Sequence, residues 1–434
     1  MQGNLRSSIF RIPSMLKMQN EWAYKPHAFS FGPWHFHNQD LMRATKQFKE
    51  MLFEGLIQRL VERQHVNVEV DISANEQELE GAISAVREGL QNARSDKKRE
   101  LEEAINAVGG KAREIYEGEI NVSQDDFQKL LLLDGCFIIE LFRRGAGEVS
   151  IQESEHVLFV GGMILTIYHD LFLLENQIPW FVLELLFDKT RGSGSRKTLV
   201  ELAITFILPA FSLDDQHPMS RELLDSCSSI VHIIDLTARY LDSSATKRIN
   251  QQSRNNSIPC ATRLREAGVK FKRVTSRNIF DVRFDKNKCA LEIPSLVIHP
   301  AMETIFRNLI IFGKSSLWNQ WAPDVIISYT MLLDTLVDGT DDVALLCRSH
   351  IFSNTNWLNH KEVVNLLKTL CGGAYTDKFH YADLYEELDS YYKRLSTKWR
   401  VYLIDNYFTK PWAIVSVIFA SIVLVFTIMQ VFYK

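Results

Sequence analysis

The residues best suited to chemistry are acidic side chains that interrupt strongly apolar stretches of the chain. His169, Asp170 and Glu175 fall in an otherwise apolar stretch that runs from about residue 155 to residue 187. A buried carboxylate is costly unless it finds a counter-charge or hydrogen-bond donors. Such a partnered group either holds the fold together or, with a shifted pKa, takes part in catalysis. The sequence favours the structural role, because no complete catalytic motif accompanies these residues.

Two further groups have the residue types of metal ligands. His35, His37 and Asp40 lie close together in the sequence, but no fourth ligand follows them. Aspartates also gather between residues 324 and 342, where Asp338-Gly-Thr-Asp-Asp is typical of a turn and a helix N-cap. The six cysteines are scattered and form no CxxC pair. The sequence therefore predicts no metal site, no cofactor and no catalytic residue.

Known signatures and overall charge narrow the function classes. The chain contains no GxGxxG, Walker, HExxH, GxSxG or EF-hand motif and no set of kinase motifs. Its 49 basic and 53 acidic residues nearly balance, with a formal net charge of −4. A nucleic-acid-binding protein would carry a basic surface, so we expect no nucleic-acid partner.

Long helices must position these residues. Apolar spacing predicts a mainly helical body with helices at about 41–63, 76–118, 124–144, 198–211, 220–242, 300–313, 323–337, 340–352, 358–371 and 381–408. Apolar and polar residues alternate in three short runs between about 269 and 298, which predicts a small antiparallel β-meander. Residues 76–118 are rich in charge and carry a short heptad-like apolar stripe. We interpret them as an amphipathic helix on the body, with a coiled coil to a partner as the alternative, and expect Gly109-Gly110 to interrupt or end this helix.

The end of the chain is the most distinctive segment. No charged residue occurs between Trp412 and Tyr433. A helix of that length measures about 33 Å, which is enough to cross the roughly 30 Å hydrocarbon core of a membrane. We predict a C-terminal transmembrane anchor at 411–434, an irregular segment at 1–38 and a helical body at 39–410. A buried core helix is the alternative for the last segment.

Orientation and assembly are less strongly encoded. The N-terminus lacks the apolar stretch of a secretory signal, and basic residues gather before the predicted anchor, with Lys434 alone after it. Both features favour a cytosolic body in a plasma membrane or endomembrane. The sequons at Asn121 and Asn255 leave the opposite orientation open. Ser416 and Ala420 have the spacing of small residues that associate in membranes, which leaves a homo-oligomer open.

Several strings occur in an order that resembles one plant family, called domain of unknown function 247. Its opening motif resembles Ser30-Phe-Gly32-Pro33-Trp-His35, and its second resembles Leu131-Leu-Leu-Asp134-Gly135-Cys136. The third and most specific resembles Asp170-Leu-Phe-Leu-Leu-Glu175-Asn176-Gln177-Ile-Pro179-Trp. Further matches at 261–271, 291–294 and 407–414 extend the resemblance over about residues 10–434. The chain departs from the family at Met42-Arg-Ala-Thr-Lys46 and near Gly313, where acidic residues are usual.

The resemblance implies a plant protein that is associated with a membrane and has no established catalytic activity. Some grass members of the family are implicated as pollen-side determinants of gametophytic self-incompatibility, with a small secreted protein as the proposed partner. Whether this chain is such a member does not follow from its residues.

The sequence thus predicts a non-enzymatic, membrane-anchored recognition or signalling protein, with 76–118 as the preferred partner surface. One alternative is a membrane-associated enzyme that uses Asp134, Asp170 or Glu175 in a buried site. The other is an oligomeric channel component. Ser416, Thr427 and Gln430 fall on different faces of the last helix, which argues against the channel.

Overall fold

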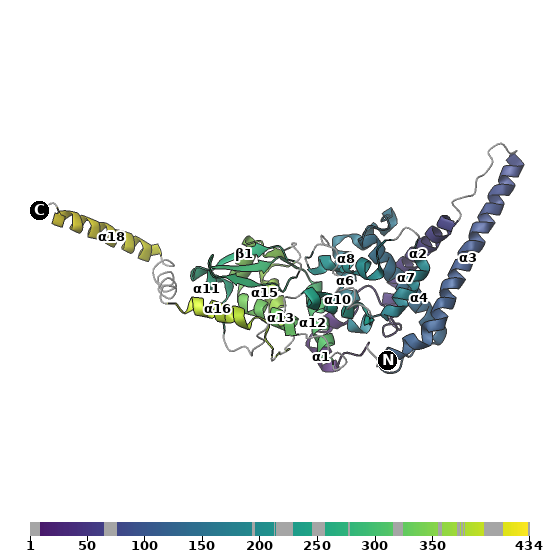
Figure 1. The fold of residues 1–434 in the computed structure, drawn as a ribbon, viewed down its shortest axis with the longest axis horizontal. Helices are drawn as coiled ribbons and strands as arrows, with labels where there is room; N and C mark the ends of the chain where they lie inside the picture. Colours follow the sequence, from purple (N-terminus) through teal and green to yellow (C-terminus); the bar gives the residue numbers. More distant parts are fainter. Residues whose placement is uncertain are drawn as a thin grey trace. The chain divides into compact units, whose positions relative to one another are not determined.

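The computed structural model describes residues 9–64, 76–192, 196–211, 213, 229–244, 257–276, 278–315, 324–354, 358–370, 374, 376, 378–394 and 411–432. The chain divides into two compact units. Unit 1 comprises Met1–Ser244 and His299–Pro323, and unit 2 comprises Ala245–Ile298 and Asp324–Lys434. The predicted mainly helical class with a small amount of sheet is confirmed (Figure 1).

Unit 1 is built from helices around α4 (Gln124–Gly145). Ser123 caps α4 by accepting a hydrogen bond from the Asp126 amide. Arg143 and Arg144 lie in its last turn, where their positive charges interact favourably with the helix dipole. Helices α2, α3, α7 and α8 pack around α4. The remaining described elements of unit 1 are short helices or helical turns. The full set is α1 (Ser14–Gln19), η1 (Glu21–Tyr24), α2 (Gln39–Gln64), α3 (Glu76–Glu114), η2 (Glu153–Glu155), α5 (His156–Phe159), α6 (Gly161–Leu171), η3 (Leu174–Asn176), α7 (Trp180–Thr190), α8 (Leu199–Ile207), η4 (Leu208–Phe211), α10 (Ile233–Ser244) and α12 (Ala301–Lys314).

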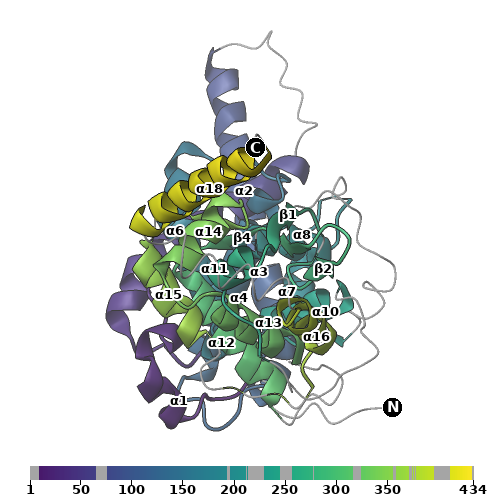
Figure 2. The same cartoon turned by 90° about the vertical axis from the view of Figure 1, so that its left-hand side faces the viewer.

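The long helix α3 has two different halves. Leu101, Ile105 and Ala112 are buried on one face of its C-terminal half. Between residues 84 and 100, in contrast, every side chain is exposed or half-buried. This half extends beyond the other helices of unit 1 in both views (Figure 1, Figure 2). We call residues 84–100 the α3 arm.

The prediction that Gly109-Gly110 interrupts this helix is wrong. The helix continues through both glycines to Glu114. A Cβ atom on Gly109 would lie 2.9 Å from Gln128 Nε2 on α4, so glycine allows close approach of the two helices without ending either. Packing against α4 outweighs the low helix propensity of glycine here.

The apolar stretch at 155–187 forms several short helical elements and not one continuous helix. Val160 is extended between α5 and α6, and Gly161 begins α6. Pro179 then caps α7, where its missing amide hydrogen costs nothing. Between α6 and α7 lies the short turn η3 with Glu175 and Asn176. This interruption between α6 and α7 matters for the site, because it places the polar residues Glu175 and Asn176 in a short turn.

Unit 2 combines helices with two small sheets. Its described elements are α11 (Ala261–Glu266), β1 (Lys270–Val274), β2 (Arg283–Asp285), β3 (Ala290–Pro294), β4 (Leu296–Ile298), α13 (Asp324–Leu336), α14 (Thr340–Arg348), β5 (Phe352–Asn354), α15 (His360–Thr369), α16 (Ala382–Tyr392) and α18 (Pro411–Phe432).

The predicted antiparallel meander is wrong in topology. The first sheet has the order β1-β3-β2, in which β1 pairs parallel with β3 and only β2 pairs antiparallel with it. A second, two-stranded sheet joins β4 and β5 in parallel. The chain between β1 and β3 includes β2 and is longer than the dozen or so residues that a crossover between parallel strands needs, so it permits β1 to pair with β3. Alternation of apolar and polar residues indicates a strand but does not specify its neighbour.

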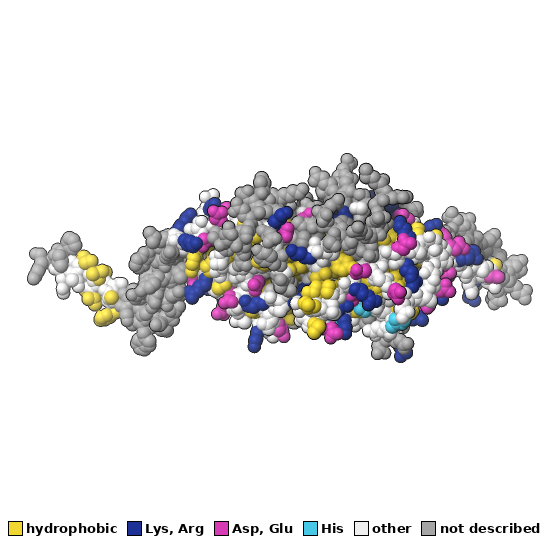
Figure 3. All heavy atoms as spheres, turned by 90° about the horizontal axis from the view of Figure 1, so that it is seen from below, with side chains coloured by type: hydrophobic (Ala, Val, Ile, Leu, Met, Phe, Trp, Pro, Cys, Tyr) yellow, Lys and Arg dark blue, Asp and Glu magenta, His cyan; other side chains and the backbone are white. Residues whose placement is uncertain are grey.

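The C-terminal helix α18 covers Pro411–Phe432 and includes Trp412, while Tyr433 lies outside the described residues. Its side chains are described from residue 419 to residue 430, where all are exposed, and Figure 3 shows hydrophobic and no charged ones there. Among the described residues, no helix has both the length and the apolar character needed to cross a membrane. The expected transmembrane anchor is therefore not supported by the described part of the chain. The predicted segments at 220–228 and 395–408, like Asn255, also lie outside it.

Helix packing at Gly135 yields a test. A Cβ atom there would lie 2.5 Å from Leu186 Cδ1 on α7, and Leu186 is fully buried. We expect Gly135→Val to lower the free energy of unfolding by about 2 kcal/mol, because the added atoms overpack the contact between α4 and α7. Chemical denaturation of the full chain measures this change.

The matched control is Gly110→Val in α3, where an added Cβ atom would meet no neighbouring atom of the described residues within 4 Å. We expect that variant to stay within about 0.5 kcal/mol of wild type, because valine and glycine differ little in helix propensity. Equal losses in both variants would contradict the importance of the α4–α7 contact.

Candidate functional site

The three motif regions of the sequence come together around the N-terminal segment, residues 9–36. The segment makes its hydrogen bonds to α4, to α6 and to the turn η3, all within unit 1. We call this set of contacts the strap site. It joins residues that are more than 140 positions apart in the sequence.

Asp170 is the centre of the strap site and is completely buried. Its Oδ1 accepts a hydrogen bond from the His27 amide at 2.8 Å, and its Oδ2 accepts from the amides of Ala28 at 2.8 Å and Phe29 at 2.7 Å. Three successive backbone donors thus face one carboxylate. Charge-assisted hydrogen bonds of this kind are among the stronger ones in proteins.

Glu175 and Asn176 hold the segment on both sides of Asp170. Glu175 accepts hydrogen bonds from the Ile12 amide at 2.7 Å and from the Lys17 ammonium at 2.6 Å. The Asn176 side chain accepts from the Phe31 amide and donates to the carbonyl oxygen of Phe29, as a strand neighbour would. The predicted irregular segment in fact contains α1 and η1, and outside them these two side chains bind the backbone of Ile12, Phe29 and Phe31.

Gln177 stabilises the turn itself. Its Nε2 donates to the carbonyl oxygens of Leu171 and Leu173, which end α6. Its backbone carbonyl oxygen accepts a hydrogen bond from the Tyr116 hydroxyl at 2.9 Å. Gln177 therefore fixes the corner that presents Glu175 and Asn176 to the segment.

Asp134 of α4 forms the third attachment. It pairs with the Lys49 ammonium at 2.5 Å and accepts a hydrogen bond from the Gly32 amide at 3.0 Å. Burial raises the pKa of Asp134, although Lys49 and the Gly32 amide both favour the charged form. Gly32 has a φ of 67°, and a Cβ atom there would lie 2.7 Å from the Gln177 carbonyl oxygen, so only glycine fits.

The other motif residues act in packing. Pro33 is buried beside Gly32, Gly135 lets α7 approach α4, and Pro179 begins α7. His35 is half-buried, and desolvation lowers its pKa. His37 is exposed, with Nε2 2.7 Å from the Asn121 carbonyl oxygen, which does not bring it into a metal site with His35. The side chain of Asp40 lies outside the described part of the chain.

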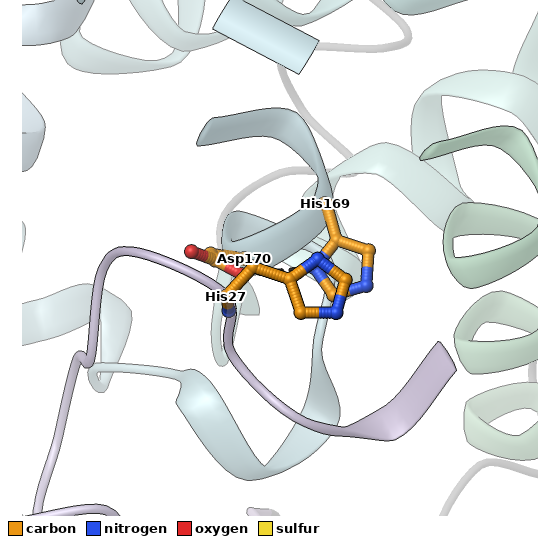
Figure 4. A group of neighbouring side chains, drawn as sticks. All are labelled: His27, His169 and Asp170. Carbon is orange, nitrogen blue, oxygen red and sulfur yellow. Dashed lines mark hydrogen bonds and ion pairs between the residues drawn. The ribbon is translucent and has the colours of Figure 1, made fainter. Parts of the chain in front are cut away.

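A cluster of metal-ligand types does occur at the strap site, at His27, His169 and Asp170 (Figure 4). His169 Nδ1 lies 2.8 Å from Asp170 Oδ1, and its Nε2 lies 3.1 Å from the Trp22 carbonyl oxygen. Both oxygens of Asp170 already accept backbone hydrogen bonds. A metal ion would therefore have to displace existing hydrogen bonds, so the geometry fits a structural cluster better than a metal centre.

A second buried network is barely visible in the sequence. Glu140 of α4 is completely buried and pairs with three guanidinium groups, those of Arg59, Arg143 and Arg144. Arg144 also forms a bidentate ion pair with Glu155. Burial opposes ionisation, but the three guanidinium groups hold the pKa of Glu140 below its usual value. The only sequence signal was the adjacent pair of arginines three and four residues after Glu140.

Asp342 in unit 2 acts as a turn and capping residue. Its carboxylate accepts hydrogen bonds from the amides of Thr262, Asp338 and Gly339. The aspartate-rich stretch at 324–342 thus uses this side chain to hold backbone, as the turn and N-cap pattern predicts. Backbone hydrogen bonds contribute to the lowered pKa of Asp342, against the effect of burial.

Four of the buried carboxylates that the structure describes in unit 1 are bound to structural partners. Asp134 and Glu175 pair with lysines, Asp170 binds backbone amides, and Glu140 binds arginines. One described pocket of unit 1, between α3 and α4, has a volume of about 180 Å³ and is lined by Asp125 and Lys129 among others. None of the four buried carboxylates lines it.

The central role of Asp170 leads to a prediction. Asp170→Asn keeps the shape but removes the charge and turns an NH₂ group toward backbone donors. We expect a loss of about 3 kcal/mol in the free energy of unfolding, because buried amides lose their acceptor. The matched control, Asp188→Asn, changes an exposed carboxylate of α7 and should cost no more than about 0.5 kcal/mol. If both variants unfold at the same denaturant concentration, Asp170 does not hold the segment.

Comparisons with known proteins agree with the motifs. Residues 9–426 match the family DUF247, described as "Plant protein of unknown function". The chain is 22% identical over 447 residues to the UPF0481 protein At3g47200 of Arabidopsis thaliana, covering 97% of this chain and 85% of that protein. It is 24% identical over 496 residues to the putative UPF0481 protein At3g02645 of the same plant, covering 98% and 89%. No solved structure matches the chain. The motif resemblance is thereby confirmed, and the chain belongs to the DUF247 family of plant proteins.

Proposed function

We propose that this protein is a non-enzymatic recognition or signalling protein that is anchored to a membrane through α18. The observation that carries the proposal is the use of the buried acidic groups. Asp134, Asp170, Glu175 and Glu140 all bind backbone amides or basic side chains within unit 1. Groups that hold the fold in this way are poorly placed to exchange protons with a substrate.

The main alternative is a membrane-associated enzyme that uses these carboxylates. It would require a polar pocket in which at least one of them faces a substrate. The described pocket in unit 2, of about 390 Å³, is lined by Asp383, Glu386, Glu387 and neighbours on α16 and β2. Lys286 already pairs with Glu387 there, at 3.2 Å. The lining includes Ser390, but in the described structure this hydroxyl makes no hydrogen bond to any of the carboxylates, so the pocket shows no activated nucleophile.

Recognition needs a surface, and the α3 arm is the best candidate. It carries charges of both signs, including the exposed residues Arg87, Glu88 and Arg94. It contacts α2 and α7 near its C-terminal end, through Lys98 and Glu100. Its C-terminal continuation is held rigidly by Leu101 and Ile105. A rigid, charged helix can select a partner by charge complementarity at little entropic cost.

Membrane anchoring rests on the composition and exposure of α18. Its 22 residues include no acidic or basic side chain. Phe419, Leu424 and Phe426 are each more than 60% exposed, and such a continuous apolar surface needs a partner or lipid to cover it. We take lipid to be that cover, because the sequence from Trp412 to Tyr433 contains no charged residue, as is typical of a membrane span.

Truncation tests the anchor. A chain that ends at Lys410 should move from the membrane fraction to the aqueous fraction after gentle lysis, whereas the full chain stays with the membranes, because the shortened chain lacks the uncharged stretch from Trp412 to Tyr433. A charged control, in which Ser421 is replaced by Arg, should also reduce membrane insertion, since a charge at the centre of a span costs about 3 kcal/mol. Equal recovery of all three chains in the aqueous fraction would overturn the proposed anchor.

Arm variants test the recognition surface. Reversing the charges of Arg87 and Arg94 to Glu should reduce by about tenfold the recovery of partner proteins with the tagged full chain from plant membranes, because charge complementarity is lost. The matched control reverses two exposed charges in unit 2, Arg348 and Lys361. An unchanged set of recovered proteins in the arm variant would exclude the arm as the main partner surface.

A self-incompatibility role with a secreted partner is the finer form of this proposal, and it depends on topology. The basic residues before α18 favour a cytosolic body, whereas a secreted partner requires the body outside the cytosol. Asn121 is exposed and begins an N-glycosylation sequon. A glycosidase-sensitive shift that disappears in Asn121→Gln would place the body outside the cytosol and support the secreted partner.

A further inference from the structure

Two imidazole rings stack where the N-terminal segment meets α6. The rings of His27 and His169 have centroids 3.7 Å apart and an angle of 17° between their planes (Figure 4). The Trp22 ring contacts both, at centroid distances of 4.3 Å and 4.8 Å. His27 is exposed to solvent, while His169 is buried. One ring of the stack is thus open to protons from solvent.

Both ring nitrogens of His169 face hydrogen-bond acceptors. Its Nδ1 faces the Asp170 carboxylate and its Nε2 faces the Trp22 carbonyl oxygen, and both of these are acceptors. A neutral imidazole carries one N–H, so it can satisfy only one of the two contacts. The ring donates to both when it is an imidazolium, whose charge the Asp170 carboxylate balances.

The surroundings of His27, in contrast, disfavour a positive charge on its ring. Its ring lies flat against that of His169, and its backbone amide donates to Asp170. Desolvation is the largest cause that lowers the pKa of His27, followed by the charge of His169, while Asp170 and a hydrogen bond to the Trp22 backbone act in the opposite direction. A positive charge on the His27 ring is therefore disfavoured where it lies against His169.

We propose that His27 makes the strap site sensitive to acid, because its protonation places a positive charge face to face with the His169 ring, which contacts Asp170, and weakens the hold of Asp170 on the amides of His27, Ala28 and Phe29. The segment is then fastened near neutral pH and loosened in acid. This inference goes beyond the proposed recognition function, because it concerns a conformational switch in the fold and needs no partner.

The direction follows from proton linkage. A histidine whose pKa is lower in the folded than in the unfolded state binds fewer protons when folded. Its contribution is fully favourable above the ordinary value of about 6.5 and is lost as the pH falls toward the lowered folded value. The attachment should therefore weaken in the mildly acidic range and not on going from neutral to alkaline pH.

The other charged groups around this stack are paired. They are Asp170 on α6, Lys17 with Glu175, Glu21 with Lys25 on η1, and Glu303 with Arg307 on α12, which packs against η1. The other histidine of the segment is His35, whose pKa is also lowered by desolvation. His35 is therefore the alternative titrating group that the experiment must separate from His27.

Hydrogen exchange on the full chain in detergent tests the switch. Exchange at the amides of His27, Ala28 and Phe29 is measured between about pH 7.5 and about pH 5 and corrected for intrinsic exchange rates. In wild type we expect the opening constant to rise as pH falls, by about tenfold for each unit by which folding lowers the His27 pKa. A peptide from α4 reports whether unit 1 stays folded.

Three variants identify the responsible group. In His27→Gln and in His27→Phe, which keeps an aromatic ring but no ionisable proton, the pH dependence should disappear. In the matched control His35→Gln it should persist. A flat wild-type profile, a pH dependence that survives in both His27 variants, or its loss in His35→Gln would overturn the proposal.

Discussion

The structure of unit 1 depends on one constraint, which is that a buried carboxylate must be surrounded by donors. Asp170 is completely buried and receives three consecutive backbone amides of the N-terminal segment. Those amides belong to an irregular stretch that has no ladder partner of its own. The charge of Asp170 and the free donors of the segment therefore need each other, and their pairing determines the path of residues 9–36 across the helices.

The same constraint recurs around α4. Asp134 binds Lys49 and the Gly32 amide, and Glu140 gathers three arginines from α2 and α4. Buried charge networks of this kind add little net stability compared with apolar packing, but a missing partner is strongly penalised. They therefore specify one arrangement of α2, α4 and the N-terminal segment. This explains why acidic residues occur inside the apolar helices of unit 1.

Because the buried carboxylates of unit 1 hold the fold together, we assign the proposed recognition activity to exposed helices. The α3 arm combines exposed charges with a rigid base in the helical core, and α18 presents an uncharged apolar helix. The strap site adds a different property, because its histidine stack links the attachment of the N-terminal segment to protons. A protein that meets compartments of different pH would experience that link directly.

The sequence by itself determined which segments become helices and which residues belong together as motifs. The helix at 124–144 and the start and approximate length of the helix at 76–118 follow from apolar spacing, and the family follows from ordered strings around Gly32, Asp134 and Glu175. These features are local, since helix periodicity and motif spacing are read within a few turns of chain. The need of Asp170 and Glu175 for partners was also evident from composition alone.

Only the tertiary structure decided who those partners are. Composition suggested an arginine or backbone amides for Asp170 and Glu175, but the partners are the amides of His27 to Phe29 for one and Lys17 with the Ile12 amide for the other. The tertiary structure likewise determined that β1 pairs with β3 and that His27 stacks on His169. Each of these contacts joins positions far apart in the sequence, and its energy depends on burial and on alignment of donor with acceptor. Neither quantity exists until the chain has folded, so no pattern of residue types along the sequence can encode it alone.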